Sequence, residues 1–295
     1  MSSQQLRIMV YRHSVFYSPL IAAIAGGFLK EEGLEAAYFP KPPQRNLYEM
    51  FRQGEVHIMQ AAVSTSWDPL SKGMRDIPVH FAQINQRDGF FITGRPRDAS
   101  FEWKDLEGAR LLADHAQQPL AMLKYALHLK GVAVSHIHMI DAGGPEAMEK
   151  EFRAGQGDFV HLQGPVPQQL EKDGAGRIVA AVGEVIPSVA FSSLMAMREF
   201  LTTGKAQAFM NAYLRALRFV IESSASEIAE IEAPFFPGIS TDAIAAAISR
   251  YQQLGTWRYD PRITREQYEV AVDVFMFSGV FKERYPYEDV VVSMI

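Results

Sequence analysis

The feature that most constrains this chain is an alternation of strand-like and helix-like segments along its first two thirds. Apolar runs at residues 6–11, 34–39 and 56–59 predict strands, and the stretches between them have helical spacing. Strands that alternate with helices are typical of α/β domains, in which helices cover a largely parallel sheet. The first helix is expected to run from Ser18 to about Glu32.

The same alternation restarts after residue 96. Strands are expected at residues 109–113, 137–140 and 157–162, with helices between them. The final third instead has apolar residues at three- and four-residue spacing, which predicts helices. One of these should begin at Thr264, because residues 264–267 have the spacing of a capping box.

Length and composition limit the classes of protein that fit this pattern. A chain of 295 residues favours two domains over one large core. The net charge of −5 disfavours a basic surface for nucleic acid. The chain contains no cysteine, which removes thiol nucleophiles, disulfides and cysteine-ligated metal centres. Its longest early apolar run is too short for a membrane span, so none is expected.

The first residues bear on the expected location. Residues 1–11 lack the basic start and apolar run of a secretory signal, and they read as a first strand. We therefore expect a cytoplasmic protein if this start is the native one, and a periplasmic protein if a leader was removed.

Motifs for nucleotide, hydrolase and metal chemistry are missing. There is no phosphate-binding glycine loop, no dinucleotide-binding fingerprint, no nucleophile elbow and no zinc-binding histidine motif. His136 and His138 would share one face of a strand, but a lone pair of histidines is a weak metal signature, and a surface position is favoured. No metal site and no cofactor are expected.

Polar loops at the ends of predicted strands are the candidates for ligand contact. Open α/β sheets bind ligands beyond the carboxyl ends of their strands, and here four loops follow strands, at residues 12–17, 60–67, 114–118 and 161–164. A helix that begins near Pro119 would direct backbone N–H groups into the same space. The candidate ligand-binding residues are His13, Tyr17, Ala62, Ser64, Thr65, Arg87, His115, Gln117, Gln118, His161, Gln163 and Phe191.

Some residues have a structural interpretation beside the functional one. His57 and His80 lie inside strand-like runs and are expected to be structural. Arg87 lies between the two halves, where a hinge ion pair is as reasonable as ligand contact. An aromatic wall for a planar ligand could come from Phe16, Tyr17, Trp67 and Phe191, although a core position is favoured for Trp67.

The order of short motifs resembles that of nitrate, sulfonate and pyrimidine-type periplasmic binding proteins. Tyr17-Ser18-Pro19-Leu20 and then Gly27-Phe28-Leu29-Lys30-Glu31-Glu32-Gly33-Leu34-Glu35 resemble the opening of that family. Residues 53–58 resemble its next strand, except that His57 stands where aspartate is usual. Residues 106–111 resemble the entry to its second lobe, and Gly155-Gln156-Gly157-Asp158 an element within that lobe. The resemblance covers residues 6–200 in motif order.

The resemblance implies a type-II periplasmic-binding-protein fold, with two α/β lobes of mixed sheets flanked by helices. Lobe one would comprise residues 1–90 and 191–295, and lobe two residues 91–190, with hinge crossovers near 85–97 and 185–195. The implied function is that of a substrate-binding protein for nitrate, sulfonates, taurine or thiamin-pyrimidine precursors. It would close on a small planar or anionic ligand and deliver it to an ABC permease.

Enzymes also occur on this fold, so the fold alone does not decide the function. The absence of cysteine excludes the iron-dependent pyrimidine synthases and the thiol-dependent desulfinases of the superfamily. The remaining enzymatic alternative is a cytosolic lyase or decarboxylase that uses histidine acid/base chemistry, with His13, His115 or His161 as its candidates. We favour the binding protein over this alternative.

Overall fold

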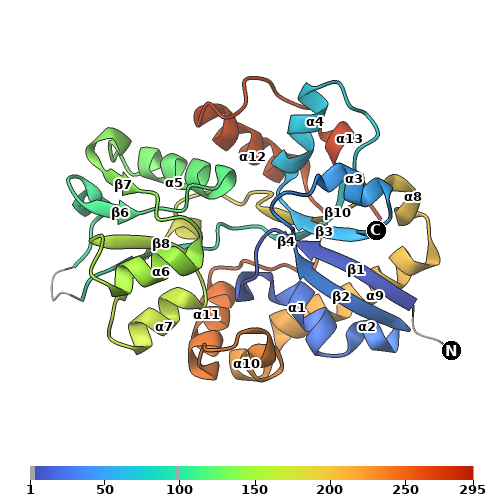
Figure 1. Ribbon diagram of the computed structural model, residues 1–295, viewed down its shortest axis with the longest axis horizontal. Helices are drawn as coiled ribbons and strands as arrows, with labels where there is room; N and C mark the ends of the chain where they lie inside the picture. Colours follow the sequence, from blue (N-terminus) through green and yellow to red (C-terminus); the bar gives the residue numbers. More distant parts are fainter. Residues whose placement is uncertain (1–3, 97–99, 295) are drawn as a thin grey trace.

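The computed structural model describes residues 4–96 and 100–294. Within these residues the strands form two five-stranded sheets (Figure 1). Sheet A has the order β2-β1-β3-β10-β4, from β1 (Gln4–Val10), β2 (Leu34–Pro40), β3 (Ile58–Ala61), β4 (Val79–Asn85) and β10 (Ser192–Ala196). Sheet B has the order β7-β6-β8-β5-β9, from β5 (Phe90–Gly94), β6 (Arg110–Leu112), β7 (His138–Ile140), β8 (Phe159–Gln163) and β9 (Arg177–Ala181).

Each sheet contains one reversed strand. In sheet A, β1 is parallel to β2 and β3, whereas β10 is antiparallel to β3 and β4. In sheet B, β6 is parallel to β7 and β8, whereas β5 is antiparallel to β8 and β9. The reversed strands β5 and β10 are those that enter a sheet directly from the other sheet, without an α-helix on the way. The alternation of segments predicted the common direction and not these two reversals.

Helices pack on both faces of each sheet. The helices are α1 (Ser18–Ala25), α2 (Phe28–Glu31), α3 (Leu47–Arg52), α4 (Trp67–Ser71), α5 (Gln117–Leu129), α6 (Pro145–Arg153), α7 (Val166–Lys172), α8 (Arg198–Leu201), α9 (Gly204–Glu222), α10 (Ala225–Glu232), α11 (Thr241–Gln253), α12 (Arg265–Phe277) and α13 (Tyr287–Val290). In β1, Ile8 packs into a core with α1 and α9, whereas its neighbour Met9 packs with α3 on the other face. In sheet B, Leu111 faces α5, and Leu112 faces α6 and α7.

The first predicted helix is divided in two. The sequence predicted one helix over residues 18–32, but the structure separates α1 from α2 at Gly26 and Gly27. Gly27 has φ of 79°, in the left-handed region, which ends α1 and redirects the chain. A Cβ on Gly26 would come within 2.6 Å of the Phe28 ring. The prediction of one continuous helix was therefore wrong, because the two adjacent glycines allow a sharp turn between α1 and α2.

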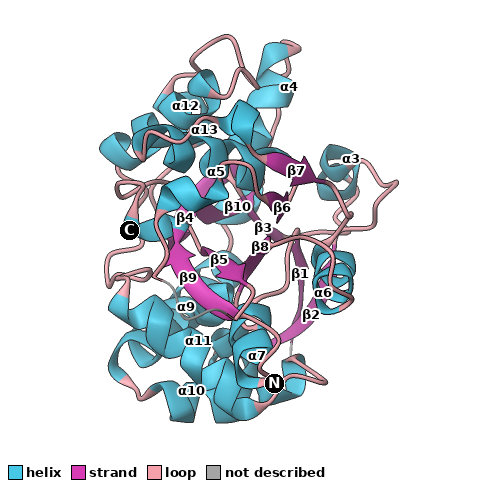
Figure 2. Ribbon diagram, turned by 90° about the vertical axis from the view of Figure 1, so that its left-hand side faces the viewer, coloured by secondary structure: helices cyan, strands magenta, loops and turns pink. Residues whose placement is uncertain are grey.

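The C-terminal helices connect the two sheets. Figure 1 shows α11 between the two halves on one side and α12 on the other. Helix α11 contacts α7 and the 3₁₀ turn η1 (Val15–Tyr17), and α12 contacts α5 and the 3₁₀ turn η2 (Val63–Ser66). In Figure 2, α4, α12 and α13 lie above the strands, and α7, α10 and α11 lie below them.

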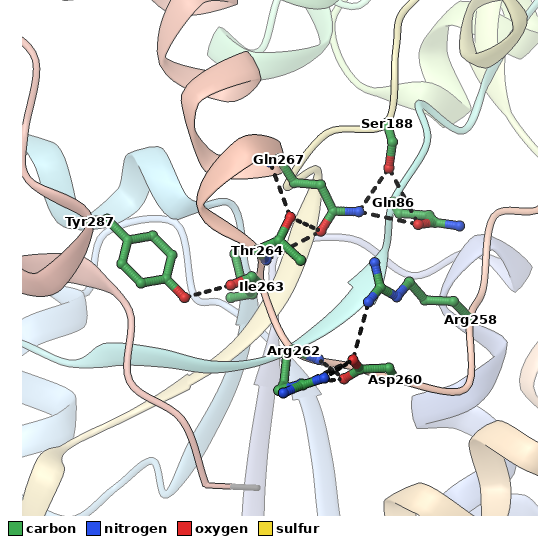
Figure 3. A network of polar contacts seen from close by, with 9 residues as sticks. All are labelled: Gln86, Ser188, Arg258, Asp260, Arg262, Ile263, Thr264, Gln267 and Tyr287. Carbon is green, nitrogen blue, oxygen red and sulfur yellow. Dashed lines mark hydrogen bonds and ion pairs between the residues drawn. The ribbon is translucent and has the colours of Figure 1, made fainter.

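The chain passes between the sheets twice, at a first crossover from β4 to β5 and at a second crossover from β9 to β10. Helix α12 is hydrogen-bonded to both crossovers. The predicted capping box is confirmed, since Thr264 and Gln267 cap the start of α12 reciprocally. The Gln267 amide also donates to Ser188 Oγ at 2.7 Å and to Gln86 Oε1 at 3.1 Å (Figure 3). Gln86 lies in the first crossover and Ser188 in the second. The two crossovers are joined directly by the hydrogen bond from Val189 N to Gln86 O, 3.0 Å long.

Candidate functional site

A cavity of about 460 Å³ lies between the two sheets, and we call it cavity 1. Loops that follow β1 and β3 line it from sheet A, and the start of α5 and the end of β8 line it from sheet B. Its lining residues are Tyr11, Arg12, Tyr17, Leu47, Tyr48, Gln60, Ala62, Ser64, Thr65, Asp68, Phe90, Gln117, Gln118, Pro119, Gln163 and Phe191. A ligand in cavity 1 would therefore touch both halves of the molecule at once.

Most residues selected from the sequence lie together here. Eight of the twelve candidates line cavity 1: Tyr17, Ala62, Ser64, Thr65, Gln117, Gln118, Gln163 and Phe191. They meet because β3 and β8 end at the space between the sheets and α5 begins there. Whether they bind a ligand stays a prediction.

The other four candidates lie elsewhere. His13 lines a second cavity of about 700 Å³, which we call cavity 2 and which shares Tyr11, Arg12 and Gln163 with cavity 1. Arg87 lines neither cavity, because its guanidinium turns to the second crossover and donates to Ile186 O at 3.4 Å. His115 also lines neither, and its Nδ1 is 2.8 Å from Ala113 O.

His161 is the fourth, and it is fully buried behind the cavity wall. Its ring stacks on Phe90 with 4.3 Å between centroids, and Phe90 rather than His161 lines cavity 1. Neither ring nitrogen has a hydrogen-bond partner among the described residues. Burial lowers the pKa of His161 to about 3, with a smaller contribution from the charge of Arg12. The imidazole is therefore neutral at physiological pH and shielded from any ligand in cavity 1.

His13 is engaged at both ring nitrogens. Nε2 is 2.7 Å from Phe235 O, which can only accept, so this nitrogen carries the proton. Nδ1 is 2.9 Å from Tyr38 OH and accepts from it. Burial lowers the pKa of His13, and the hydrogen bond to Phe235 O partly opposes that shift. His13 is thus a neutral structural group that helps to close cavity 2.

The aromatic wall differs from the one the sequence suggested. Phe16 and Trp67 are buried in the core and line neither cavity. Trp67 packs edge-on against Phe275 of α12, and its Nε1 donates to Tyr268 OH at 2.9 Å. The core position favoured for Trp67 is confirmed, whereas Phe16 as a wall residue was wrong. Tyr17 and Phe191 line cavity 1 as predicted, and Tyr11, Tyr48 and Phe90 add further aromatic lining.

Several polar residues of cavity 1 support the wall. Gln60 Oε1 accepts from the backbone N–H groups of Tyr11 and Arg12 at 3.2 and 3.3 Å, and its amide donates to Ser192 Oγ at 2.7 Å. Gln118 donates to Phe191 O at 2.8 Å, which joins the start of α5 to the second crossover. Because these two side-chain amides are hydrogen-bonded within the protein, their role is to shape the cavity.

Other polar groups of cavity 1 have no such partner. The side chains of Ser64, Thr65 and Gln117 line the cavity and make no hydrogen bond to the residues that the structure describes. Ser64 and Thr65 come from the turn after β3, and Gln117 is the first residue of α5. Two hydroxyl groups and one carboxamide are therefore available to a ligand from opposite sides.

The charged groups of cavity 1 are paired. Arg12 Nη2 lies 2.7 Å from Asp114 Oδ2, and the Asp114 side chain is only 5% exposed. Asp68 pairs with Lys72 at 2.8 Å on the outside of α4. Asp88 lies in the first crossover and is 1% exposed. Burial raises the pKa of Asp88 to about 8, and the negative charge of Asp114 adds to that rise.

Eight lining residues were absent from the candidates, and the sequence carried a signal for some of them. Arg12 and Gln60 belonged to strand-end loops that were already selected, so taking whole loops would have included them. Tyr48 and Phe90 had no such signal, because one lies within α3 and the other opens a strand. Only the packing of the two sheets places their rings at the cavity.

The described residues contain neither a metal-binding cluster nor a membrane-spanning helix. Within residues 4–96 and 100–294, no group of three or more His, Cys, Asp or Glu side chains is arranged to hold a metal ion. None of the helices in that part of the chain is long and apolar enough to cross a membrane.

Known proteins with the same fold include ligand-binding components of import systems. A Staphylococcus aureus ligand-binding component of an ABC-type import system, solved with zinc bound, superposes with a TM-score of 0.77 at 15% identity, over 99% of this chain and 97% of that one. The alkanesulfonate-binding protein SsuA of Xanthomonas axonopodis pv. citri, solved with MOPS bound, gives 0.74 at 17% identity, over 99% of both chains. The predicted type-II periplasmic-binding-protein fold is confirmed by these likenesses.

Sequence comparison goes beyond the fold. The chain is 27% identical to YtlA of Bacillus subtilis (strain 168), whose name proposes a binding protein, over 97% of this chain and 87% of YtlA. Residues 16–226, well over half of the chain, match the sequence profile described as NMT1/THI5 like. The resemblance drawn from short motifs is thereby confirmed, and the chain belongs to the NMT1/THI5-like family.

Proposed function

We propose that this chain is the substrate-binding component of an ABC-type import system and holds a small ligand in cavity 1. One observation carries the proposal: unpaired polar side chains face cavity 1 from both sheets, with Ser64 and Thr65 on one side and Gln117 on the other. The volume of about 460 Å³ lies in the range of small-molecule sites. The names of YtlA and of the structural neighbours from import systems support the same role.

We further propose that the two sheets belong to two lobes that close on the ligand. Lobe one would comprise residues 1–90 and 191–295, and lobe two residues 91–190. The crossovers that join at Gln86 and Val189 are suited to act as the hinge, because every covalent connection between the sheets passes through them. A ligand that contacts Ser64 and Gln117 together would favour the closed state, since the open state offers only one of them.

The chemistry of cavity 1 suits a planar, polar ligand. Phe90 and Phe191 offer aromatic surface, and the hydroxyl and amide groups of Ser64, Thr65 and Gln117 can both donate and accept hydrogen bonds. Such a ligand would be released to a permease in the membrane. This role requires the protein to act on the outer side of the cytoplasmic membrane, the second of the two locations considered from the sequence.

The histidine-dependent lyase is not favoured by this geometry. Its three candidate residues lie apart: His13 closes cavity 2, His115 lines neither cavity, and His161 is buried. General acid/base catalysis requires a side chain within hydrogen-bond reach of the reacting group. Cavity 1 offers amides and hydroxyls in that position instead.

Calorimetric titration of a ligand panel tests the proposal. Nitrate, taurine, ethanesulfonate and 4-amino-2-methylpyrimidine would be titrated into the protein, and the tightest ligand carried forward. Gln117→Ala is expected to weaken its binding about tenfold, the loss of one or two hydrogen bonds. Gln253→Ala is the matched control, because Gln253 is exposed at the end of α11 and, among the described residues, its side chain bonds only to Ser249. Chemical conversion of the ligand, or equal affinity in Gln117→Ala and the unaltered protein, would contradict the proposal.

A further inference from the structure

Arg12 is the one lining residue on which an anionic ligand would depend. Among the described residues that line cavities 1 and 2, it is the only one with a full positive charge, because His13 is neutral. Arg12 lies at the boundary of the two cavities and is a lining residue of both. Its guanidinium also lies over the Phe90 ring, 5.7 Å from the centroid. An anion in cavity 1 would therefore contact a positively charged side chain only if it bound near Arg12.

This guanidinium already has an anion from the protein itself. Asp114 approaches Arg12 from the opposite sheet, with 2.7 Å between Nη2 and Oδ2. The Asp114 carboxylate is held from behind, because its Oδ1 accepts from Ala116 N at 2.9 Å in the turn that opens α5. The carboxylate is 5% exposed, so little solvent screens it. Its position is fixed by the fold rather than by the ligand.

The remaining charges around cavity 1 add no positive potential. Asp68 lines cavity 1, but its carboxylate is already paired with Lys72 at 2.8 Å. Burial raises the pKa of Asp88, and the negative charge of Asp114 adds to that rise. An anion near Arg12 would meet the repulsion of Asp114 at the same distance scale as the attraction of Arg12, because the two side chains are in contact.

We propose that Asp114 is a specificity-determining residue, which occupies Arg12 and thereby restricts cavity 1 to uncharged or cationic ligands. This inference rests on the proposed function and sharpens it, because it separates this chain from binders of nitrate and sulfonates. Specificity of this kind comes from a repulsive group built into the site as much as from the attractive contacts. Asp114 touches no ligand in this scheme and acts through Arg12.

Two pairs of compounds that differ in charge and little in shape test the proposal in the unaltered protein. They are nicotinamide with nicotinate, and ethanesulfonamide with ethanesulfonate, each titrated by calorimetry at matched ionic strength. The uncharged member of each pair is expected to bind at least about tenfold more tightly than its anion. Tighter binding of either anion than of its amide would overturn the proposal while leaving a substrate-binding function intact.

The second arm uses Asp114→Asn, which keeps an acceptor for Ala116 N–H and removes the charge. This variant is expected to gain about tenfold in affinity for ethanesulfonate or nicotinate, and the double variant Arg12→Gln/Asp114→Asn should lose the gain. Asp68→Asn is the control, with a gain below about threefold, because the Asp68 partner is Lys72. An equal gain in Asp68→Asn, or none in a folded Asp114→Asn, would overturn the proposal.

The two proposals can fail separately. If all four compounds bind neither the unaltered protein nor Asp114→Asn, while the ligand panel above gives no binding either, the substrate-binding function itself fails. If the panel yields a ligand and that ligand is an anion bound through Arg12, only the role of Asp114 fails. The unaltered protein decides this second point without any variant, so a folding defect in Asp114→Asn would not protect the proposal.

Discussion

At the scale of single residues, two neighbours on one strand illustrate what places a side chain at the cavity. His161 and Gln163 are two positions apart on β8 and so share one face of sheet B. Gln163 stands at the strand end and lines both cavities, whereas His161 lies one layer deeper and is covered by Phe90. Whether a side chain near a strand end reaches the cavity therefore depends on its depth along the strand as well as on the face of the sheet that it occupies.

The first prediction concerns His161→Phe. Phenylalanine keeps the stacked ring and removes two buried nitrogens without hydrogen-bond partners, so stability at pH 7 should rise by about 1 kcal/mol. The folded pKa of about 3 lies below the ordinary value of 6.5, so a buried neutral His161 loses stability as pH falls from 6.5 towards 3. At pH 4.5 the phenylalanine variant should avoid roughly 2–3 kcal/mol of that loss. Urea unfolding at both pH values measures these differences.

The matched comparison is His136→Phe, since His136 is an exposed histidine on the surface of the same half. It should change the pH dependence of unfolding by less than about 0.5 kcal/mol. A His161→Phe variant that is as acid-sensitive as the unaltered protein would contradict the burial argument. Loss of ligand binding with unchanged stability would instead give His161 a role in the site.

The sequence located the site at the level of loops and was less reliable for individual side chains. Strand-end loops brought Ser64, Thr65 and Gln117 to cavity 1 as expected, because strand ends converge between the sheets. The pairing of Arg12 with Asp114 joins residues a hundred positions apart, and no local pattern encodes it. Phe16 failed as a wall residue for the same reason, since an aromatic ring in a loop suits either a core or a cavity until the packing is known.

At the scale of elements, the turn between α1 and α2 departs most from the expected pattern. Ser18 and Pro19 predicted the start of a helix and Gly33 its end, so the sequence predicted one helix over residues 18–32. The structure uses Gly27 in a left-handed conformation to end α1 and start α2, which keeps both against α9. Helix spacing alone cannot detect such a turn, because both pieces present apolar residues to the same neighbour.

The second prediction is that Gly27→Ala destabilises the fold by about 1 kcal/mol. The loss comes from backbone strain, because at φ of 79° the alanine Cβ lies too close to its own backbone. It does not come from a clash with other residues, since none of their atoms lies within 4 Å of the new methyl group. Gly204→Ala is the control: Gly204 opens α9 at ordinary φ, and its Cβ would also meet nothing within 4 Å. It should be neutral or stabilising by up to about 1 kcal/mol. Equal effects of both variants on the urea midpoint would contradict this account.

At the scale of the whole molecule, α11 holds the two sheets in their relative position. Tyr251 OH accepts from Gly164 N at 2.8 Å and donates to Gly89 O at 2.8 Å. Gly164 follows the last strand residue of β8, and Gly89 precedes β5 at the first crossover. One hydroxyl group therefore links a C-terminal helix, the loop beside both cavities and the connection between the sheets. The alternation of segments predicted that two units exist, but it held no information on how such contacts orient them.

The last prediction is that Tyr251→Phe destabilises the protein by about 1–3 kcal/mol, because it leaves the buried Gly164 N–H and Gly89 carbonyl without their partner. Ligand affinity should also fall, since the loop at Gly164 is then less firmly held against α11. Tyr259→Phe removes one exposed hydroxyl, which bonds to Glu222 at 3.3 Å, and should cost less than about 0.5 kcal/mol. Urea unfolding with calorimetry of the bound ligand separates the two effects. Unchanged stability in Tyr251→Phe would mean that the sheets are oriented by apolar packing of α11 alone.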